Sequence, residues 1–376
     1  MPDHTPAHRP PPPPRPPRPS PPVAPAPEGP GPDRPLALLL PGQGAQHPGM
    51  AVALYGRDEV FTDRMDAFFA LLGPAQGAAM RADWLAGPDR PAALLDGPLR
   101  AQPLLFAVEF ALGSSLLLRG VRPAALLGHS VGELAAAALA GVFDLPTAAR
   151  FMAARSDALA ALPDGGMLAV AAAPAELAPY LGPPGRDDGV VVGGVNAPRQ
   201  TLLAGPEPAL SALGARLVAA GLVCRPVPAG RPYHAPAAVP AALRALRALP
   251  ASRLRAPRIP IRSTRTGRWV TDTEARDPGF WAYQLARPVL FWPALDGLLA
   301  GGAHTLAEVG PGQQLSVLAR RHPAVRSGHS GVFAALPPGA AGTPEHWRDA
   351  LARLGAADAV PAGTAASAPT YRRAGR

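Results

Sequence analysis

Short apolar runs that stop at glycine alternate with longer stretches of helical periodicity along this chain. Residues 36–40 are five consecutive apolar residues followed at once by Pro41-Gly42-Gln43-Gly44, and residues 124–128 form a second run that ends at a glycine. Such runs predict buried strands that enter tight loops. Apolar positions at helical spacing predict helices at residues 103–118, 131–139 and 146–159. Strand, sharp turn and helix in succession form the unit of an open α/β sheet.

The pattern changes after residue 166. The runs there predict strands at residues 167–172, 190–195, 201–204 and 223–227, with helices at residues 174–181 and 208–220. This spacing is typical of the β-α-β-β-α-β unit of a small ferredoxin-like subdomain. Strand-like and helical segments of the earlier kind resume at residues 260–263, 280–285 and 304–309, so the small unit would be an insertion.

The predicted fold class is therefore α/β. We expect a large α/β-hydrolase-like (patatin-like) domain with a mostly parallel sheet, plus a small inserted ferredoxin-like α+β subdomain. The expected boundaries are residues 36–162 and 228–355 for the large domain and 163–227 for the small one.

Both ends of the chain have a different composition. Residues 1–35 hold 17 of the 52 prolines and almost no large apolar side chains, so this segment cannot bury enough surface to offset ordering its backbone. We expect a disordered Pro-rich tail over 1–35 and a flexible C-terminal tail over 356–376. The remainder should be globular, because 48% of the residues are hydrophobic and 17% are charged.

Charge and cysteine content narrow the function classes. The chain has 36 basic residues, all arginine, against 27 acidic ones, for a net charge of +9. Because the arginines are scattered singly and 5% of residues are aromatic, a nucleic-acid partner is not expected, whereas acidic or phosphate-bearing partners fit. The single cysteine, Cys224, excludes an internal disulfide or a cysteine metal cluster.

The start of the chain lacks the apolar segment of a signal peptide, and no apolar stretch reaches the roughly 18 residues expected of a membrane helix. We therefore expect a cytoplasmic protein without a membrane partner.

The main chemical signal is the pentapeptide Gly128-His129-Ser130-Val131-Gly132, placed after a predicted strand and before a predicted helix. This G-x-S-x-G pattern is the nucleophile elbow, in which small neighbours let the backbone turn sharply and hold the serine hydroxyl out at the strand's end. The helix that follows would direct backbone N–H groups at charge that develops on a bound acyl oxygen.

A serine nucleophile requires a base within hydrogen-bond reach. Of the nine histidines, His129 is adjacent to the serine and more naturally supports the turn. His234 follows a predicted strand and opens a loop, which favours it as the base, while His47 and His304 stay open as alternatives.

Taken together, these blocks resemble the malonyl-CoA:acyl carrier protein transacylase family, in particular the acyltransferase domains of polyketide synthases. The resemblance covers residues 36–355 and includes the opening Pro41-Gly42-Gln43-Gly44, the elbow GHSVGEL at residues 128–134, Arg155, the block 195–198, His234, the block 281–285 and the block 308–312.

This resemblance implies a role for each matching residue. Ser130 would attack the thioester of an acyl-CoA and His234 would act as base, with its ring held by the backbone carbonyl of Gln284 in place of a carboxylate. The backbone N–H groups of Gln43 and Val131 would form the oxyanion hole. Gln102 and Asn196 match positions that line the cleft.

Arg155 bears on the substrate class. In the family it forms a bidentate pair with the free carboxylate of malonyl-type substrates, a geometry that suits guanidinium. Tyr233, an aromatic residue before the histidine, and the valine after the serine both favour malonyl, although residues 231–234 match neither of the family's usual motifs. The resemblance thus implies no bound cofactor, with a malonyl-CoA-type substrate and an acidic, phosphopantetheinylated acyl carrier protein as partner.

Three alternatives stay open. A proofreading acyl hydrolase would replace the acceptor thiol with water, but it would have little use for Arg155. A catalytically silent docking protein would be expected to lose at least one of Ser130, Arg155 and His234. A metal enzyme is disfavoured, since no histidine and carboxylate cluster has ligand spacing.

Overall fold

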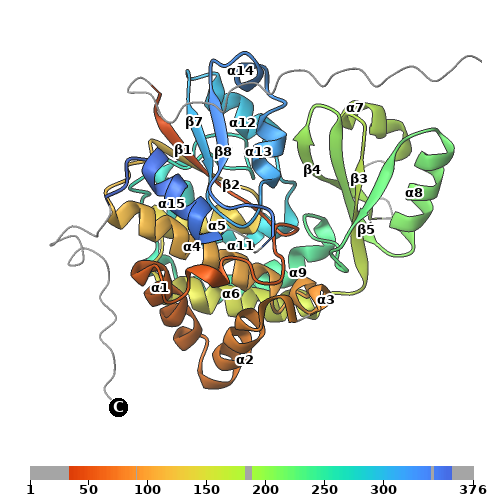
Figure 1. Ribbon diagram of the computed structural model, residues 1–376. Coiled ribbons are helices and arrows are strands. Elements are labelled where there is room, and N and C mark those ends of the chain that lie inside the picture. The colour runs from red at the N-terminus through yellow and green to blue at the C-terminus, as the bar shows by residue number, and fades with distance from the viewer. Residues whose placement is uncertain (1–33, 90, 183–188, 340–342, 358–376) are drawn as a thin grey trace, which may run out of the picture.

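The computed structural model describes residues 34–89, 91–182, 189–339 and 343–357. These residues form two sheets, each with its own helices, which lie beside one another in Figure 1. The predicted tails, 1–35 and 356–376, lie outside the described residues except for residues 34, 35, 356 and 357.

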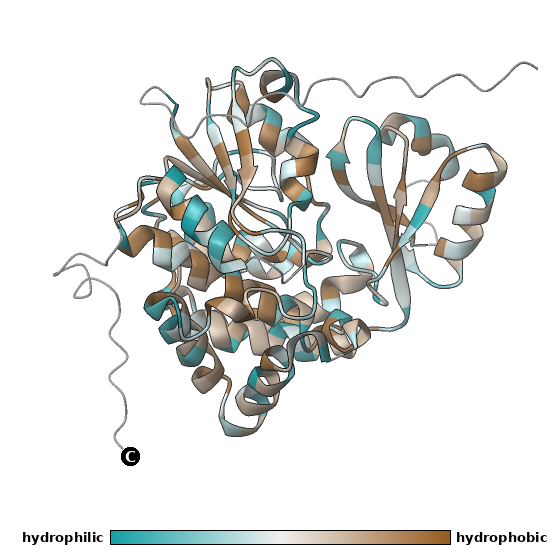
Figure 2. Cartoon of the chain, viewed as in Figure 1, coloured by the Kyte–Doolittle hydropathy of each residue, from teal (hydrophilic) through white to brown (hydrophobic). Residues whose placement is uncertain are grey.

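The first sheet is parallel and has the strand order β2-β1-β7-β8. Its strands are β1 (Leu36–Leu40), β2 (Ala125–Gly128), β7 (Thr305–Glu308) and β8 (Gly331–Ala334). Nearly every residue in them is buried, as expected when helices cover both faces of a parallel sheet. Their apolar residues appear as brown segments in Figure 2.

Helices surround this sheet on both faces (Figure 1). Those before the second sheet are η1 (Val52–Leu54), α1 (Glu59–Leu71), α2 (Pro74–Leu85), η2 (Gly87–Asp89), α3 (Ala92–Asp96), α4 (Ala101–Leu118), α5 (Val131–Leu139) and α6 (Leu145–Ala160). Those after it are η4 (Pro236–Ala238), α9 (Val239–Leu246), η5 (Ala251–Arg253), α10 (Asp272–Arg276), α11 (Pro278–Ala282), η6 (Tyr283–Ala286), α12 (Phe291–Leu299), α13 (Gln314–Ala319), α14 (Pro323–Arg326) and α15 (Thr343–Arg353).

The second sheet is antiparallel and has the order β4-β5-β3-β6. Its elements follow the chain as β3 (Gly165–Val170), α7 (Pro174–Leu177), η3 (Ala178–Tyr180), β4 (Val191–Ala197), β5 (Gln200–Pro206), α8 (Ala209–Ala219) and β6 (Cys224–Val227). Strand β4 also contacts the first part of the fold, because the amide of Val195 donates to the carbonyl of Val289.

Helix α4 corrects one expectation. Its 18 residues are long and apolar enough, by length and composition, to cross a membrane, although the sequence was expected to hold no stretch of that length. In the fold 83% of this segment is buried, because α4 packs against α1 and α5 within the core. Helix α4 is thus a core element of the part of the fold that contains the parallel sheet.

The strands β1 and β2 position the chemistry. They run parallel and in register, with Leu40 paired to Gly128, so the loops that leave both strands meet at one edge of the sheet. Ligands in open α/β sheets bind at this carboxyl edge.

Candidate active site

Ser130 stands on a strained turn between β2 and α5. Its φ of 54° and ψ of −117° are rare for a residue with a side chain. The flanking glycines make the turn possible: a Cβ on Gly128 would lie 2.2 Å from the amide nitrogen of Glu133, and one on Gly132 would lie 2.2 Å from the carbonyl oxygen of Leu40. The elbow expected from the sequence is therefore the local geometry observed.

The structure places His234 against this serine. Its Nε2 lies 2.7 Å from Ser130 Oγ, and its Nδ1 lies 2.9 Å from the backbone carbonyl oxygen of Arg287. Because a carbonyl only accepts, Nδ1 carries the proton and Nε2 is free to accept from the serine hydroxyl. The serine is thus paired with a base in the tautomer that can take its proton.

The residue that chiefly holds the ring differs from the one expected. The family resemblance assigned this task to the backbone carbonyl of Gln284, whereas the hydrogen bond from Nδ1 goes to the carbonyl of Arg287. The carbonyl of Gln284 also faces the ring, but it raises the pKa of His234 less than the carbonyl of Arg287 does. The reason is that residues 283–286 form a 3-10 turn, η6, and the carbonyl of the extended residue after it points back at the histidine.

His234 is held in a position that keeps it neutral. Its backbone has a φ of 61°, and its amide donates to the carbonyl of Leu285 at 2.7 Å. Burial, followed by the positive charge of Arg155, lowers the pKa of His234 to about 3. The ring therefore stays an unprotonated base throughout the neutral range.

Arg155, on α6, is 1% exposed and has no carboxylate partner among the described residues. Its Nε donates to Gln102 Oε1 at 2.9 Å, and one terminal nitrogen donates to Gln284 Oε1 at 3.3 Å. The other terminal nitrogen is buried without an acceptor. Burial lowers the pKa of Arg155 to about 10, so the guanidinium stays charged but poorly compensated.

Side-chain amides join this arginine to Ser130 and to the loop after β1. Gln284 Nε2 donates to the backbone carbonyl of Ser130 at 2.5 Å. Gln102 Nε2 donates to Gln43 Oε1 at 3.1 Å. The chain of amides therefore ties the position of Arg155 to that of Ser130 on one side and of Gln43 on the other.

The two backbone N–H groups expected to bind an oxyanion are available. Val131 is the first residue of α5, where helix geometry leaves its amide without an acceptor within the helix. In the described residues, neither this amide nor that of Gln43 donates to the loops, turns and caps around it. The direction of each group toward a bound acyl oxygen stays a prediction.

The remaining predicted residues support the site. His129 Nε2 lies 2.9 Å from Asn196 Oδ1, and its backbone amide donates to the carbonyl of Leu40, which fits its expected role in holding the turn. Tyr233 is 3% exposed, and its hydroxyl donates to no acceptor in the described part of the chain. Burial raises the pKa of Tyr233, and the charge of Arg155 is the largest influence that opposes that rise.

The alternative bases lie in other hydrogen bonds. His47 Nδ1 contacts the carbonyl of the next residue, Pro48, and His304 Nδ1 contacts the carbonyl of Gly302. Neither is hydrogen-bonded to Ser130. The described ranges also contain no group of three or more histidine, cysteine, aspartate and glutamate side chains that could hold a metal ion.

Sequence reasoning missed one supporting carboxyl group. Glu133 lies in the quoted elbow block and is fully buried, where its Oε2 accepts from Thr264 Oγ1 at 3.1 Å and from Gln284 Nε2 at 3.5 Å. Burial raises the pKa of Glu133. Its place in the motif was the available signal, but the partners come from a segment more than 100 residues away.

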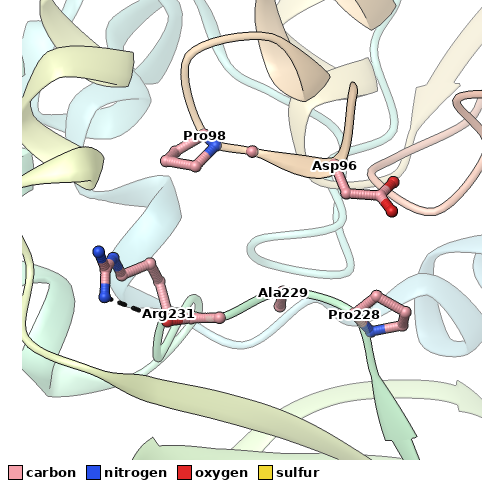
Figure 3. Close-up of a pocket in the computed structure, with 7 residues that line it drawn as sticks. Asp96, Pro98, Pro228, Ala229 and Arg231 are labelled. Carbon is pink, nitrogen blue, oxygen red and sulfur yellow. Dashed lines mark hydrogen bonds between the residues drawn. The ribbon is translucent and has the colours of Figure 1, made fainter. Parts of the chain in front are cut away.

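A cavity of about 450 Å³ lies beside these residues. Figure 3 shows the segment of Asp96 and Pro98 on one side and the segment of Pro228, Ala229 and Arg231 on the other. Both walls connect to the site: Gln43 Nε2 donates to the backbone carbonyl of Asp96 at 3.4 Å, and Arg231 precedes Tyr233 and His234 in the chain. The Asp96 and Arg231 side chains point in opposite directions, and Arg231 forms its salt bridge with Asp164.

Residues 38–336 match the family model for the acyl transferase domain, which is more than half of the chain. The chain belongs to the acyl transferase family. This acyl transferase is 38% identical over 297 residues to one of the phenolphthiocerol/phthiocerol polyketide synthase subunits of Mycobacterium tuberculosis, covering 79% of this chain and 19% of that protein. It is 37% identical over 296 residues to erythronolide synthase EryA2 of Saccharopolyspora erythraea, covering 74% of this chain and 8% of that protein. The acyl transferase thus spans about a fifth or less of the length of these relatives.

Solved structures agree with this assignment. The acyltransferase domain from the second module of the salinomycin polyketide synthase has a TM-score of 0.75 at 32% identity, with 88% of this chain and 75% of that chain covered. The SpnD acyl transferase domain in complex with 2-(pent-4-yn-1-yl)malonyl has a TM-score of 0.76 at 32% identity, with 90% and 79% covered. The malonyl CoA-acyl carrier protein transacylase from Clostridium perfringens shares the fold, with a TM-score of 0.72 at 22% identity and 85% and 97% covered.

Proposed function

We propose that this acyl transferase moves a malonyl-type acyl group from coenzyme A to the phosphopantetheine thiol of an acyl carrier protein. Ser130 carries the acyl group as an oxygen ester, and His234 handles the proton in both half-reactions. The pathway is polyketide or fatty-acid biosynthesis. We also assign the antiparallel part to the ferredoxin-like class and the parallel part to the patatin-like class of α/β-hydrolase folds, on the strand orders described above.

The observation that carries this proposal is the buried, charged Arg155 one amide away from the nucleophile. A guanidinium removed from water is costly unless an anion pairs with it, and here its acceptors are the neutral oxygens of Gln102 and Gln284. A substrate with a free carboxylate supplies the missing partner in bidentate geometry. An acyl group without a carboxylate leaves the charge uncompensated.

The first half-reaction begins at the Ser130–His234 hydrogen bond. His234 Nε2 takes the hydroxyl proton as Ser130 Oγ bonds to the thioester carbonyl carbon. The N–H groups of Gln43 and Val131 stabilise the oxyanion of the tetrahedral intermediate. The C–S bond then breaks, and the proton on His234 goes to the departing coenzyme A thiolate.

The second half-reaction runs the same steps in reverse order. The carrier protein's thiol gives its proton to His234 and attacks the ester carbonyl, and the proton returns to Ser130 Oγ as the acyl group leaves. The carbonyl of Arg287 accepts from Nδ1 throughout, so the imidazolium forms without a neighbouring carboxylate.

Substrate charge and base strength are coupled. After burial, the charge of Arg155 is the largest cause of the lowered pKa of His234. A bound carboxylate neutralises that charge and so raises the basicity of His234 once a malonyl-type substrate is in place. This coupling favours acylation by dicarboxylic acyl groups beyond what binding alone provides.

The cavity in Figure 3 supports entry of a thin, flexible arm. Its walls combine Pro98, Pro228 and Ala229 with the backbone of glycines, which suits a pantetheine chain of methylene and amide groups. The donor and acceptor proposed here share that arm. One channel therefore serves both half-reactions.

Intact-protein mass spectrometry tests the proposal. The enzyme is incubated briefly with malonyl-CoA, methylmalonyl-CoA and acetyl-CoA in competition, beside Ser130→Ala and, as a matched control, Ser252→Ala at an exposed position. A malonyl or methylmalonyl adduct present in the wild type and the control and absent from Ser130→Ala is expected. Release of free coenzyme A without any adduct favours a hydrolase, and an acetyl adduct in excess contradicts the dicarboxylate assignment.

A further inference from the structure

Two buried polar atoms without partners belong to neighbouring groups in the site. One is the terminal nitrogen of Arg155 described above, and the other is the hydroxyl of Tyr233. Their side chains are 1% and 3% exposed, and the two groups interact electrostatically. A buried hydroxyl without an acceptor costs stability, so its presence beside a second buried donor that lacks an acceptor points to a shared ligand.

Besides Arg155, two groups act on the phenol: the charge of Arg231 and a hydrogen bond with the Gln43 side chain both lower the pKa of Tyr233. The Gln43 side chain also donates from Nε2 to the carbonyl of Asp96 and accepts at Oε1 from Gln102. A hydrogen bond that lowers the pKa of a phenol is one that its oxygen accepts, so Gln43 acts as a donor to Tyr233 and leaves the Tyr233 proton without an acceptor among the described residues.

We propose that the Tyr233 hydroxyl is a second donor to the free carboxylate of the acyl group, alongside Arg155. This inference rests on the proposed function and names a positioning residue for its substrate. The phenol interacts with Arg155 and with Gln43, and both of these residues belong to the hydrogen-bonded chain of amides that reaches Ser130. With the bidentate pair from the arginine and one further donor from the phenol, the carboxylate is held on two sides.

The isosteric variant Tyr233→Phe removes this donor and keeps the ring. We expect kcat/KM for malonyl-CoA acylation to fall by about tenfold to a hundredfold, as for a hydrogen bond to a charged group, with acetyl-CoA acylation unchanged within about twofold. The variant should also melt at a higher temperature than the wild type without substrate, because it no longer buries an unpaired hydroxyl. Tyr180→Phe, in η3 of the antiparallel part, is the control and should change neither reaction.

The outcomes separate this inference from the proposed function. If the wild type forms a malonyl adduct and Tyr233→Phe forms it at the same rate, the second donor is refuted while the transferase stands. A gain in methylmalonyl over malonyl without loss of rate would show that the ring acts only by its size and would also overturn the inference. If the wild type forms no malonyl adduct, the proposed function itself fails.

A separate observation concerns the surface. Residues 208–271 contain no aspartate or glutamate but carry the arginines at positions 216, 225, 231, 244, 247, 253, 255, 258, 262, 265 and 268. The middle five, Arg244, Arg247, Arg253, Arg255 and Arg258, are all exposed. In the described ranges none of these five has a salt bridge or a side-chain hydrogen bond.

This arginine surface, defined by those five residues, lies on the second half of α9 and the segment that follows. The inner face of α9 is made of small residues and packs on α6 and η6, the elements that carry Arg155 and Gln284. Stabilising the negative end of α9 would account for Arg244 and Arg247 but not for the three arginines beyond the helix. Arg244 and Arg247 are thus one helix away from Arg155, and the described residues provide no salt bridge for any of the five arginines.

We infer that the arginine surface docks the acidic carrier protein that accepts the acyl group. Leu243 is 49% exposed and lies one turn before Arg247 on the same face of α9, so the surface is mixed basic and apolar. An acidic protein helix offers both carboxylates and apolar side chains in return, whereas a phosphate backbone offers no apolar counterpart. This inference also rests on the proposed function.

The triple variant Arg244→Glu, Arg247→Glu, Arg253→Glu tests the docking. The probe is a holo acyl carrier protein from a bacterial fatty-acid synthase, compared with free pantetheine as an uncharged acceptor thiol. We expect kcat/KM for the carrier protein to fall at least about tenfold at low salt, with a smaller difference at high salt, and transfer to pantetheine to stay within about twofold. Arg326→Glu on α14 is the matched control and should keep both rates.

Retained pantetheine transfer shows that the triple variant is folded and that the transferase chemistry works. Unchanged transfer to the carrier protein in that variant would overturn the docking inference. Loss of binding to a DNA duplex or to anionic lipid vesicles with unchanged carrier transfer would overturn it as well, since it would assign the surface to another partner. Absence of transfer to both acceptors by the wild type would instead refute the proposed function.

Discussion

Replacing Arg155 with methionine is the perturbation whose effects the structure specifies in most detail. Methionine has a similar length and no charge, and its flexible chain can fill the space left by the guanidinium. The substitution removes the proposed carboxylate clamp, the unpaired buried charge and one cause of the low pKa of His234.

The magnitudes follow from the environment of the guanidinium. Two charge-assisted hydrogen bonds to a carboxylate contribute about 3–5 kcal/mol, so malonyl-CoA acylation should slow by about two to four orders of magnitude. The lowering of the pKa of Arg155 from its ordinary value to about 10 corresponds to about 3 kcal/mol of cost for the charged form in the free enzyme. The variant should therefore be as stable as the wild type or more stable by up to about 3 kcal/mol.

The assay is a competition between malonyl-CoA and acetyl-CoA, read as the ratio of the two acyl-enzyme masses, with urea unfolding of the free enzyme measured in parallel. The acetyl reaction should be unchanged or faster, because the pKa of His234 rises when the neighbouring charge is removed. Arg155→Lys serves as a control that keeps a charge without the planar fork, and it should lose part of the malonyl preference.

An Arg155→Met variant that keeps the wild-type malonyl-to-acetyl ratio would refute the clamp. A variant that unfolds far more easily than the wild type would refute the claim that the charge is uncompensated in the free enzyme, since it would mean that Arg155 stabilises the fold.

Three further changes have specified outcomes. As the pH falls from 6.5 toward 3, the free energy of unfolding should fall by up to about 1.4 kcal/mol per pH unit, because His234 takes up a proton in the unfolded chain but not in the folded site. Urea titrations of His234→Ala should lack this contribution to the pH dependence. Gly42→Ala should lower kcat about a hundredfold with little change in folding, because a Cβ there would lie 2.7 Å from the ring and the carbonyl of His129 and would displace the loop that carries Gln43; steady-state kinetics and circular dichroism check it. Gln284→Leu should cost about 1–3 kcal/mol of stability in denaturant and lower malonyl kcat/KM more than acetyl kcat/KM, because it removes an acceptor of the clamp; equal losses on both substrates would contradict this.

Much of the parallel part was predictable because its signals are local. The run at residues 36–40 and the helix expected at 131–139 have the observed bounds, and the helix expected at 146–159 is one residue shorter at each end than α6. The glycines at positions 128 and 132 indicate the sharp turn at Ser130. A Cβ on Gly128 would clash with the start of α5, and a Cβ on Gly132 would clash with the end of β1. Strand β8 was not predicted because its four residues sit among glycines and serines, and its pairing with β7 supplies the order that its own sequence lacks.

In the candidate site, too, some features could be predicted from the sequence and others depend on packing. Arg155 and Gln102 were assigned through the family resemblance, because an arginine or a glutamine on a helix is ordinarily solvated and its own sequence does not show that it is buried. The acceptor for His234 Nδ1 is not evident from the sequence either, because any residue can present a backbone carbonyl and only the packing of η6 decides that Arg287 does so. The unpaired hydroxyl of Tyr233 was also invisible, since an aromatic residue at that position is interpreted as bulk until its surroundings are known.

The central claim is that the acyl group passes through Ser130 to a carrier thiol, and a single-turnover chase tests it most directly. The enzyme is loaded with malonyl-CoA and freed of excess substrate, and holo acyl carrier protein is then added while peptide mapping follows both proteins. We expect malonyl to leave the Ser130 peptide and to appear on the carrier thiol at the same rate, with little free malonate. Malonyl on another residue, or its release to water at a rate that the carrier protein does not change, would contradict it.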